Sequence, residues 1–162
     1  MCEAEKRRKR ICFTGHRPEK LHHDEADVCS ILKNAIDEAM TDGFTTFISG
    51  MARGVDIWAA EIVLERKKIN PRVRLICALP HSNFEKRWSF AWQKRYKEVI
   101  DQADLVKVIS VTFSMVSYQR RNEWMVDHSA KVIAIYNGTA GGTKKTIDYA
   151  ESRGVKVDIY EA

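Results

Sequence analysis

The sequence lacks the features that mark secreted, metal-binding and membrane proteins. Its four cysteines include no CxxC pair, and no cysteine or histidine cluster has zinc-site spacing. No apolar run approaches the length of a membrane-spanning helix, and the opening residues MCEAEKRRKR are charged where a secretory signal is apolar. We therefore expect a cytoplasmic protein with reduced cysteines, no metal site and no membrane partner.

Internal repeats, low-complexity segments and linkers are also absent, so nothing in the sequence divides the chain. A length of 162 residues fits one domain, and we expect a single domain over 1–162 with a basic lead-in at 1–9. Hydrophobic residues make up 44% and charged residues 30%, which is an ordinary globular composition. The net charge of +5 favours anionic partners without identifying them.

Short apolar runs alternate with segments of helical periodicity along the whole chain. The expected strands are 11–14, 44–49, 73–79 (closed by Pro80), 104–110, 131–136 and 155–160. The expected helices are 28–40 (stopped by Gly43), 55–63, 84–100, 118–128 and 143–152. Strict alternation predicts an α/β fold, a single Rossmann-like three-layer domain with a mostly parallel sheet of about six strands.

Aromatic residues are concentrated in the third expected helix. Trp88, Trp92 and Tyr96 recur at helical spacing, which favours packing in the core over an exposed platform for stacking bases.

Three strand-to-helix turns contain glycine: 14–18, 49–54 and 136–143. Ligands of parallel sheets bind beyond the carboxyl ends of the strands, so all three turns should meet at one edge. Glycines let backbone N–H groups approach a ligand, and helix N-termini favour anions. The turns therefore favour a nucleotide or sugar-phosphate site. The candidate ligand-binding residues are Gly15, His16, Arg17, Ser49, Gly50, Arg53, Gly54, Asp56, Arg121, Gly141, Gly142 and Thr143.

Individual side chains in these turns have alternative interpretations. Arg53, between two glycines, suits a bidentate grip on phosphate, and Ser49 offers a hydroxyl. Asp56 either holds a ribose hydroxyl or caps a helix. Glu123, at the start of the helix after the fourth strand, either acts as a catalytic acid or base or complements the helix dipole.

These motifs together resemble the YpsA-like branch of the SLOG superfamily. The resemblance rests on FTGHRPEKL at 13–21, SGMARGVD at 49–56 and GGT at 141–143, and it covers nearly the whole chain in order. The superfamily is Rossmann-like and includes the DNA-processing protein DprA and the LOG nucleotide phosphoribohydrolases. LOG enzymes carry a glutamate shortly after their glycine turn, where this chain has Thr146, so the resemblance implies no LOG-type hydrolysis through that position.

Three functional hypotheses follow from the residues and the resemblance. The first is a cytosolic bacterial sensor of a nucleotide ligand such as ADP-ribose, an NAD-related compound or a nucleoside phosphate. The second is a nucleotide N-glycosidase with Glu123 or Asp56 as its carboxylate. The third is DprA-like binding of single-stranded DNA, favoured by the basic tail and opposed by the lack of an exposed stacking platform. The resemblance also implies a homo-oligomer.

Overall fold

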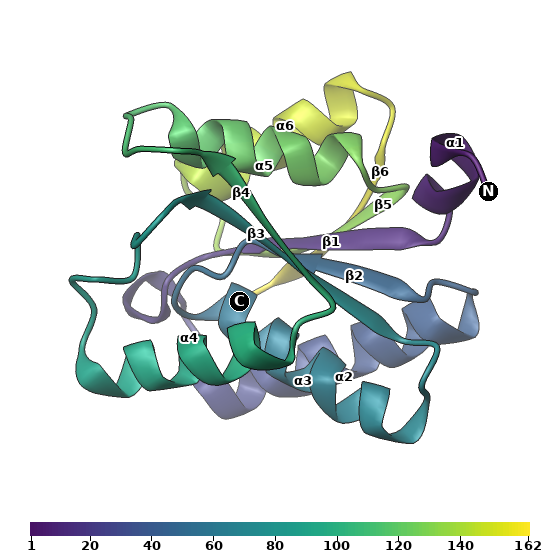
Figure 1. The fold of residues 1–162 in the computed structure, drawn as a ribbon, viewed down its shortest axis with the longest axis horizontal. Helices are drawn as coiled ribbons and strands as arrows, with labels where there is room; N and C mark the ends of the chain where they lie inside the picture. The colour runs from purple at the N-terminus through teal and green to yellow at the C-terminus, as the bar shows by residue number, and fades with distance from the viewer.

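A computed structural model describes residues 1–162 as an α/β domain built on one sheet (Figure 1). Its strands are β1 (Arg10–Gly15), β2 (Thr46–Ser49), β3 (Arg74–His81), β4 (Leu105–Ser110), β5 (Lys131–Tyr136) and β6 (Lys156–Glu161). The six strands run parallel in the order β4-β3-β2-β1-β5-β6. This arrangement confirms the predicted fold class.

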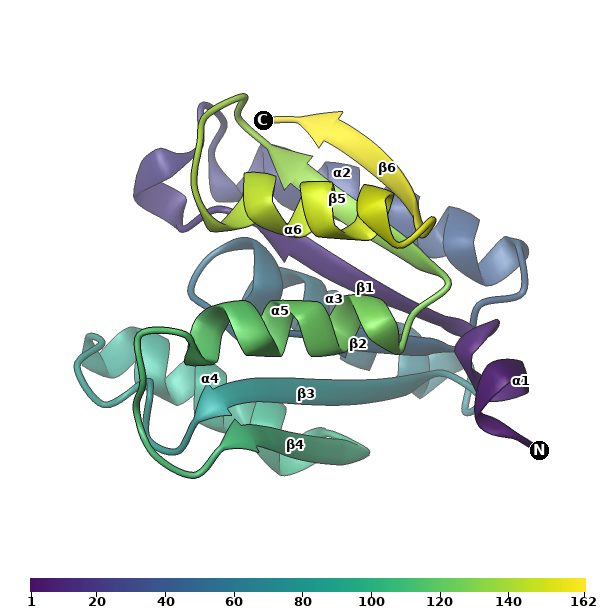
Figure 2. The same cartoon turned by 90° about the horizontal axis from the view of Figure 1, so that it is seen from above.

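Helices cover both faces of the sheet and give the domain three layers. They are α1 (Glu3–Arg7), α2 (Glu25–Thr41), α3 (Val55–Ile69), α4 (Phe90–Gln102), α5 (Ser117–Asp127) and α6 (Gly142–Ser152), with a 3₁₀ turn at Pro18–Lys20. Figures 1 and 2 show α2, α3 and α4 on one face and α5 and α6 on the other. None of these helices combines the length and apolar character needed to cross a bilayer.

The chain winds in opposite directions on the two sides of the β1–β5 pair. From β1 it proceeds through β2 and β3 to β4, whereas β5 is followed by β6 on the other side of the sheet. Such a reversal is the topological switch point at which open α/β sheets bind ligands. The turns that follow β1 and β5 therefore flank the position where a ligand is expected.

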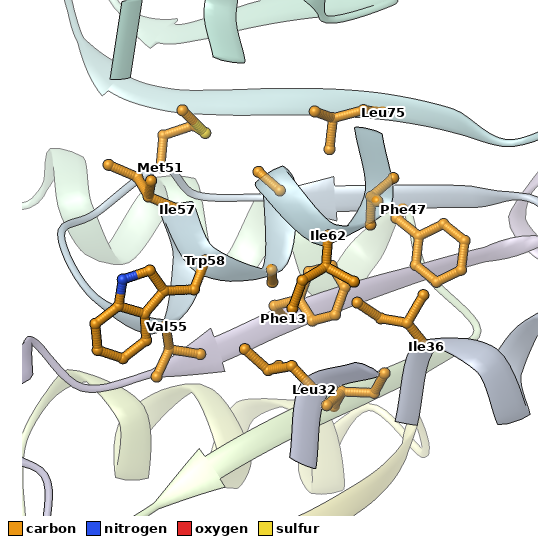
Figure 3. Packing of buried hydrophobic residues seen from close by; sticks show 14 of the residues in the cluster. Phe13, Leu32, Ile36, Phe47, Met51, Val55, Ile57, Trp58, Ile62 and Leu75 are labelled. Carbon is orange, nitrogen blue, oxygen red and sulfur yellow. The ribbon is translucent and has the colours of Figure 1, made fainter. Parts of the chain in front are cut away.

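The larger part of the core lies between the sheet and α2 and α3 (Figure 3). Phe13 of β1 and Phe47 of β2 stack there with ring centroids 6.0 Å apart, and Leu32 and Ile36 of α2 belong to the same cluster. All but one of the first ten residues of α3 are buried. Because α3 is buried on nearly every side, the turn that leads into it is held rigidly against the sheet.

Two local predictions are wrong. The aromatic helix begins at Phe90, behind an N-cap at Ser89, so Phe84 and Trp88 lie in the preceding turn. Pro80 lies inside β3 and does not end it. The proline is tolerated because β2 pairs with β3 only as far as Cys77 and the pairing with β4 skips residue 80.

The basic N-terminal segment is attached to the domain. Arg7 in α1 donates a hydrogen bond from Nε to the backbone oxygen of Ser129, at 3.0 Å. This hydrogen bond holds α1 near the amino ends of the strands, and the other basic residues of the segment lie there with it.

Candidate functional site

A cavity of about 370 Å³ lies at the carboxyl edge of the sheet. All three glycine turns contribute to its wall, which confirms their predicted convergence. The predicted site residues that line it are Gly15, His16, Arg17, Arg53, Asp56, Arg121, Gly142 and Thr143. The predicted residues outside its lining are Ser49, Gly50, Gly54, Gly141 and Glu123.

The glycines of the first two turns lie in close contact with neighbouring backbone and side chains. A Cβ at Gly15 would lie 2.5 Å from Val55, and a Cβ at Gly50 would lie 2.9 Å from the guanidinium of Arg121. Gly54 has φ of +92°, and a Cβ there would lie 2.7 Å from the backbone oxygen of His16. These contacts give the glycines a packing role, in addition to the approach to a ligand that the sequence suggests.

The third turn differs because its glycines face open space. Gly138 and Gly141 have φ of +88° and +144°, and a Cβ at Gly141 or Gly142 would meet nothing within 4 Å. Gly142 begins α6 and lines the cavity together with Thr143. The first N–H groups of a helix lack partners within the helix, so this turn is the one open to an anion.

Ser49 fixes the second turn from inside. Its hydroxyl donates to the backbone oxygen of Asp56 at 2.8 Å and accepts from the N–H of Met51 at 3.1 Å. Met51 has φ of +61°, a strained conformation for a residue with a side chain, and is fully buried. Ser49 therefore stabilises the turn and does not face the cavity.

Asp56 brings an incompletely satisfied carboxylate to the cavity wall. Its side chain is only 6% exposed, and Oδ2 accepts a hydrogen bond from the N–H of Ala52 at 3.3 Å. The other oxygen, Oδ1, is buried without any hydrogen-bond partner. Burial raises the pKa of Asp56 to about 6, against the opposing positive charge of Arg121. The site thus holds a carboxylate with spare capacity to accept a hydrogen bond.

Arg121 is a buried cation without a paired carboxylate. It is 4% exposed, and its guanidinium donates to the backbone oxygens of Gly50 and Ala78 and to Asn122 Oδ1 at 2.8 Å. No carboxylate lies within ion-pair distance of it. Burial lowers the pKa of Arg121, and the charge of Asp56 only partly opposes that effect. Such a cation is stabilised by an anion entering the cavity.

The rest of the charged lining is also mainly positive. The cavity is lined by four cations, Arg17, Lys20, Arg53 and Arg121, and by Asp56 as its one carboxylate. At the rim, Glu19 accepts from Arg53 at 3.0 Å and lies 3.8 Å from Arg17. Both arginines are partly exposed, so they can exchange this rim contact for a ligand.

His16 joins the first and third turns. Its Nε2 accepts a hydrogen bond from the N–H of Asn137 at 3.1 Å, and its ring stacks on Tyr136. Burial lowers the pKa of His16, so the ring is neutral at neutral pH. A neutral ring that accepts through Nε2 acts here as a structural link between two parts of the cavity wall.

Glu123 does not line the cavity. Its Oε2 accepts a hydrogen bond from Gln119 Nε2 at 3.0 Å, one turn earlier on α5. Of the two carboxylates that the sequence proposes, Asp56 is therefore the one inside the cavity.

The list of candidates from the sequence omits nine of the lining residues, four of them aromatic. These are Phe13, Thr14, Lys20, Ala52, Phe84, Trp88, Tyr118, Asn122 and Met125. Trp88 is predicted as core and packs on Phe84 and Tyr96, but it also faces the cavity. A useful signal was the position of Phe84 and Trp88 just after the third strand, where site residues are expected.

The fold and this cavity define a Rossmann-like α/β domain with a cavity at the carboxyl edge of its sheet. The model of the YspA SLOG family matches residues 11–158, and the chain belongs to that family. An SPbeta prophage-derived protein of Bacillus subtilis, YoqJ, is 34% identical over 119 residues, covering 65% of this chain and 68% of its own. A UPF0398 protein of Staphylococcus epidermidis is 27% identical over 93% of this chain and 87% of its own.

Two solved structures of DNA processing protein A have the same fold. The Streptococcus pneumoniae protein superimposes with a TM-score of 0.64 at 14% identity, over 95% of this chain. The Helicobacter pylori protein, described for its single-stranded DNA binding mode, gives 0.66 at 17% identity, over 97% of this chain. The match spans 50% of the first protein and 66% of the second, so it concerns one part of each.

Proposed function

We propose that the cavity binds a phosphorylated small molecule of the nucleotide or sugar-phosphate class, and that the domain acts as a sensor of that ligand. The observation that carries this proposal is Arg121, a buried cation in the cavity wall with no carboxylate partner. An anionic ligand supplies the missing charge.

Two further features favour the same class. The open turn at the start of α6 presents helix N–H groups, which suit phosphate. The unpartnered Oδ1 of Asp56 suits a hydroxyl donor, such as that of a ribose. A phosphate and a hydroxyl on one small molecule satisfy both groups.

Thermal unfolding with a ligand panel tests the proposal. The panel is AMP, ADP, ATP, NAD, ADP-ribose, ribose 5-phosphate and a short single-stranded DNA. A small ligand at one hundred times its Kd stabilises the native state by about 2.7 kcal/mol, a rise in Tm of roughly 5–10 °C.

Arg53→Ala should weaken binding by roughly 1.5–3 kcal/mol through loss of a charge-assisted contact. The matched control is Arg72→Ala, an exposed arginine near the amino ends of the strands, which should leave affinity unchanged. Equal affinities for wild type and the Arg53 variant would remove that residue from the site, and no shift with any small phosphate would contradict the proposal.

A hydrolase acting on the N-glycosidic bond is a second candidate, favoured by the placement of Asp56. A buried carboxyl group whose pKa is raised to about 6 is suited to proton transfer near neutral pH. Chromatography of nucleoside monophosphates after long incubation tests this candidate. Free base that disappears with Asp56→Asn would support it, and no free base would exclude this class of hydrolase.

Single-stranded DNA binding is a third candidate, favoured by the fold shared with the DprA structures and by a second basic surface. A groove near the amino ends of the strands is lined by Lys6, Lys9, Arg10, Arg72 and Arg74, with Asp104 as its one acid. DNA binding there should weaken steeply with salt and with charge reversal at Lys6 and Lys9. No binding of labelled DNA at low salt would exclude this candidate.

A further inference from the structure

The basic groove at the amino ends of the strands has a volume of about 380 Å³ and lies at the opposite ends of the strands from the cavity. Its floor includes Arg10, Thr46 and Arg74, the first residues of β1, β2 and β3, which are in register with one another. Residues in register on adjacent parallel strands point to the same face of the sheet, so the two arginines stand on either side of Thr46, about 10 Å apart. Lys6 in α1 and Leu105 at the start of β4 also line the groove, and Figure 2 shows α1 beside these strand ends.

Much of the positive charge in the groove is not neutralised by the protein. Lys6, Lys9 and Arg72 line it, are exposed, and have no carboxylate within 4.0 Å. Asp104 is the one acid of the lining, and it is already paired with Arg74 at 3.4 Å. The groove therefore offers three unpaired cations to an anionic partner.

These cations are attached to an ordered part of the chain. The side chain of Arg7 binds the backbone oxygen of Ser129, and the backbone oxygen of Lys9 accepts from the N–H groups of Thr45 and Thr46, at 3.1 Å each. The basic segment is thus fixed to β2 and to the residues before β5. A partner that binds it does not have to order a flexible tail first, which reduces the entropic cost of binding.

The groove contains no aromatic side chain. Proteins that bind single-stranded nucleic acids stack the bases on aromatic rings, and nothing in this groove can do so. A double helix keeps its bases inside and presents phosphates at regular intervals. Lysine, arginine and threonine hydroxyl groups are typical phosphate donors, and Thr45 and Thr46 line the groove beside the cations. A concave surface also fits the rounded backbone of a double helix better than it fits a flat membrane.

From these observations we infer that the groove binds the phosphate backbone of a double-stranded nucleic acid, independently of its sequence. The inference rests on the basic surface named for the third candidate function and changes the form of the nucleic acid, from a single strand to a double helix. It does not depend on the ligand of the cavity, which lies at the other edge of the sheet.

Fluorescence anisotropy of the full chain with a labelled short DNA duplex, and with one of its strands alone, tests the inference. If each of the three unpaired cations meets one phosphate, log K should fall with log salt with a slope of about −2.7 for the duplex. The duplex should bind about fourfold more tightly than the single strand at about 0.1 M salt, because it releases more counterions for each phosphate neutralised. A duplex of unrelated sequence should bind equally well.

The double variant Lys6→Gln/Lys9→Gln should reduce the magnitude of that slope by about 1.8, since two phosphate contacts are lost. The matched control is Lys94→Gln/Lys97→Gln, which changes the net charge equally. Both of its lysines are exposed on α4, pair with acids of the same helix and lie outside the groove, so the slope should not change. An unchanged Tm shows that each variant is folded.

A single strand that binds as tightly as the duplex would overturn the inference and leave the third candidate standing. Failure of both forms to bind at low salt would overturn the two together. Equal losses in the two double variants would show that net charge alone, and not the groove, holds the duplex. A polyglutamate peptide that displaces the labelled duplex as readily as unlabelled duplex does would also overturn the inference, because the groove would then recognise negative charge in any form.

Discussion

Gly54 is the residue at which local backbone geometry most directly shapes the cavity. Its positive φ and the short approach to His16 allow the second turn to rest on the first. Gly54→Ala should lower the free energy of unfolding by at least about 3 kcal/mol, because a strained φ and a clash with backbone act together.

Gly43→Ala is the matched control for that substitution. Gly43 has φ of +99°, but a Cβ there would meet nothing within 4 Å. Gly43→Ala should lower the free energy of unfolding by about 1 kcal/mol, because only the strained φ contributes there. Denaturant unfolding of both variants measures the difference, and equal losses would contradict the close-packing role of Gly54.

Asp56 makes a defined contribution to the pH dependence of stability. Its folded pKa of about 6 is raised above the ordinary 3.8, so the native state holds the proton more tightly than the unfolded chain does. Its contribution to stability is therefore largest below pH 4 and falls as the pH rises toward 6, by on the order of 3 kcal/mol.

Asp56→Asn should remove this pH-dependent contribution to stability. The amide oxygen of the variant can still accept a hydrogen bond from the N–H of Ala52. The difference in unfolding free energy between variant and wild type, measured from pH 4 to pH 7, should grow in favour of the variant. A difference that is constant over this range would show that Asp56 titrates normally.

At the scale of elements, Arg95 of α4 connects three helices on one face of the sheet. Its guanidinium donates to both carboxylate oxygens of Glu61 in α3, at 2.6 and 3.1 Å, and to Glu25 in α2 at 2.8 Å. It also lies 4.9 Å from the ring of Trp92. These contacts raise the pKa of Arg95 and fix α4 against its neighbours.

Arg95→Ala should lower the free energy of unfolding by about 1–2 kcal/mol, since the pairing is bidentate and partly buried. Lys97→Ala, which removes an exposed pair with Asp101 within α4, should change it by less than about 0.5 kcal/mol. Thermal or denaturant unfolding of the two variants measures the difference. Equal losses of stability would mean that the contacts of Arg95 between helices contribute nothing to the free energy of unfolding.

The order of elements was largely predictable from the sequence, because strands and helices differ in the period of their apolar residues. Lys131–Tyr136 was predicted with its observed bounds. The two wrong predictions concern the start of α4 and the end of β3, where a single residue matters more than the spacing of apolar residues. Ser89 starts α4 late, and Pro80 is tolerated inside β3 because β2 has already ended its pairing. Both depend on neighbours that the sequence does not reveal.

At the scale of the whole molecule, the two edges of the sheet differ in how they are protected. The β6 edge carries Lys156, Asp158 and Glu161, charges that discourage pairing with another strand. The β4 edge exposes Leu105, Val106 and Val108. Because one strand supplies both donors and acceptors, two copies of β4 can pair antiparallel about a two-fold axis.

We therefore expect the chain to self-associate through β4, in keeping with the predicted homo-oligomer. Val106→Glu should shift the mass measured by light scattering toward the monomer. Ile159→Glu, at an exposed position on the β6 edge, should leave the mass unchanged. A monomeric wild type would exclude this interface.

The sequence by itself determined the fold class, the order of the elements and the convergence of the three glycine turns, because local periodicity and the parallel-sheet rule suffice for these. Only the tertiary structure decided what each turn residue does. Gly50 makes room for Arg121, Ser49 holds a turn from inside, and Glu123 lies outside the cavity. These roles depend on contacts between residues far apart in the chain, and such contacts leave no local pattern in the sequence.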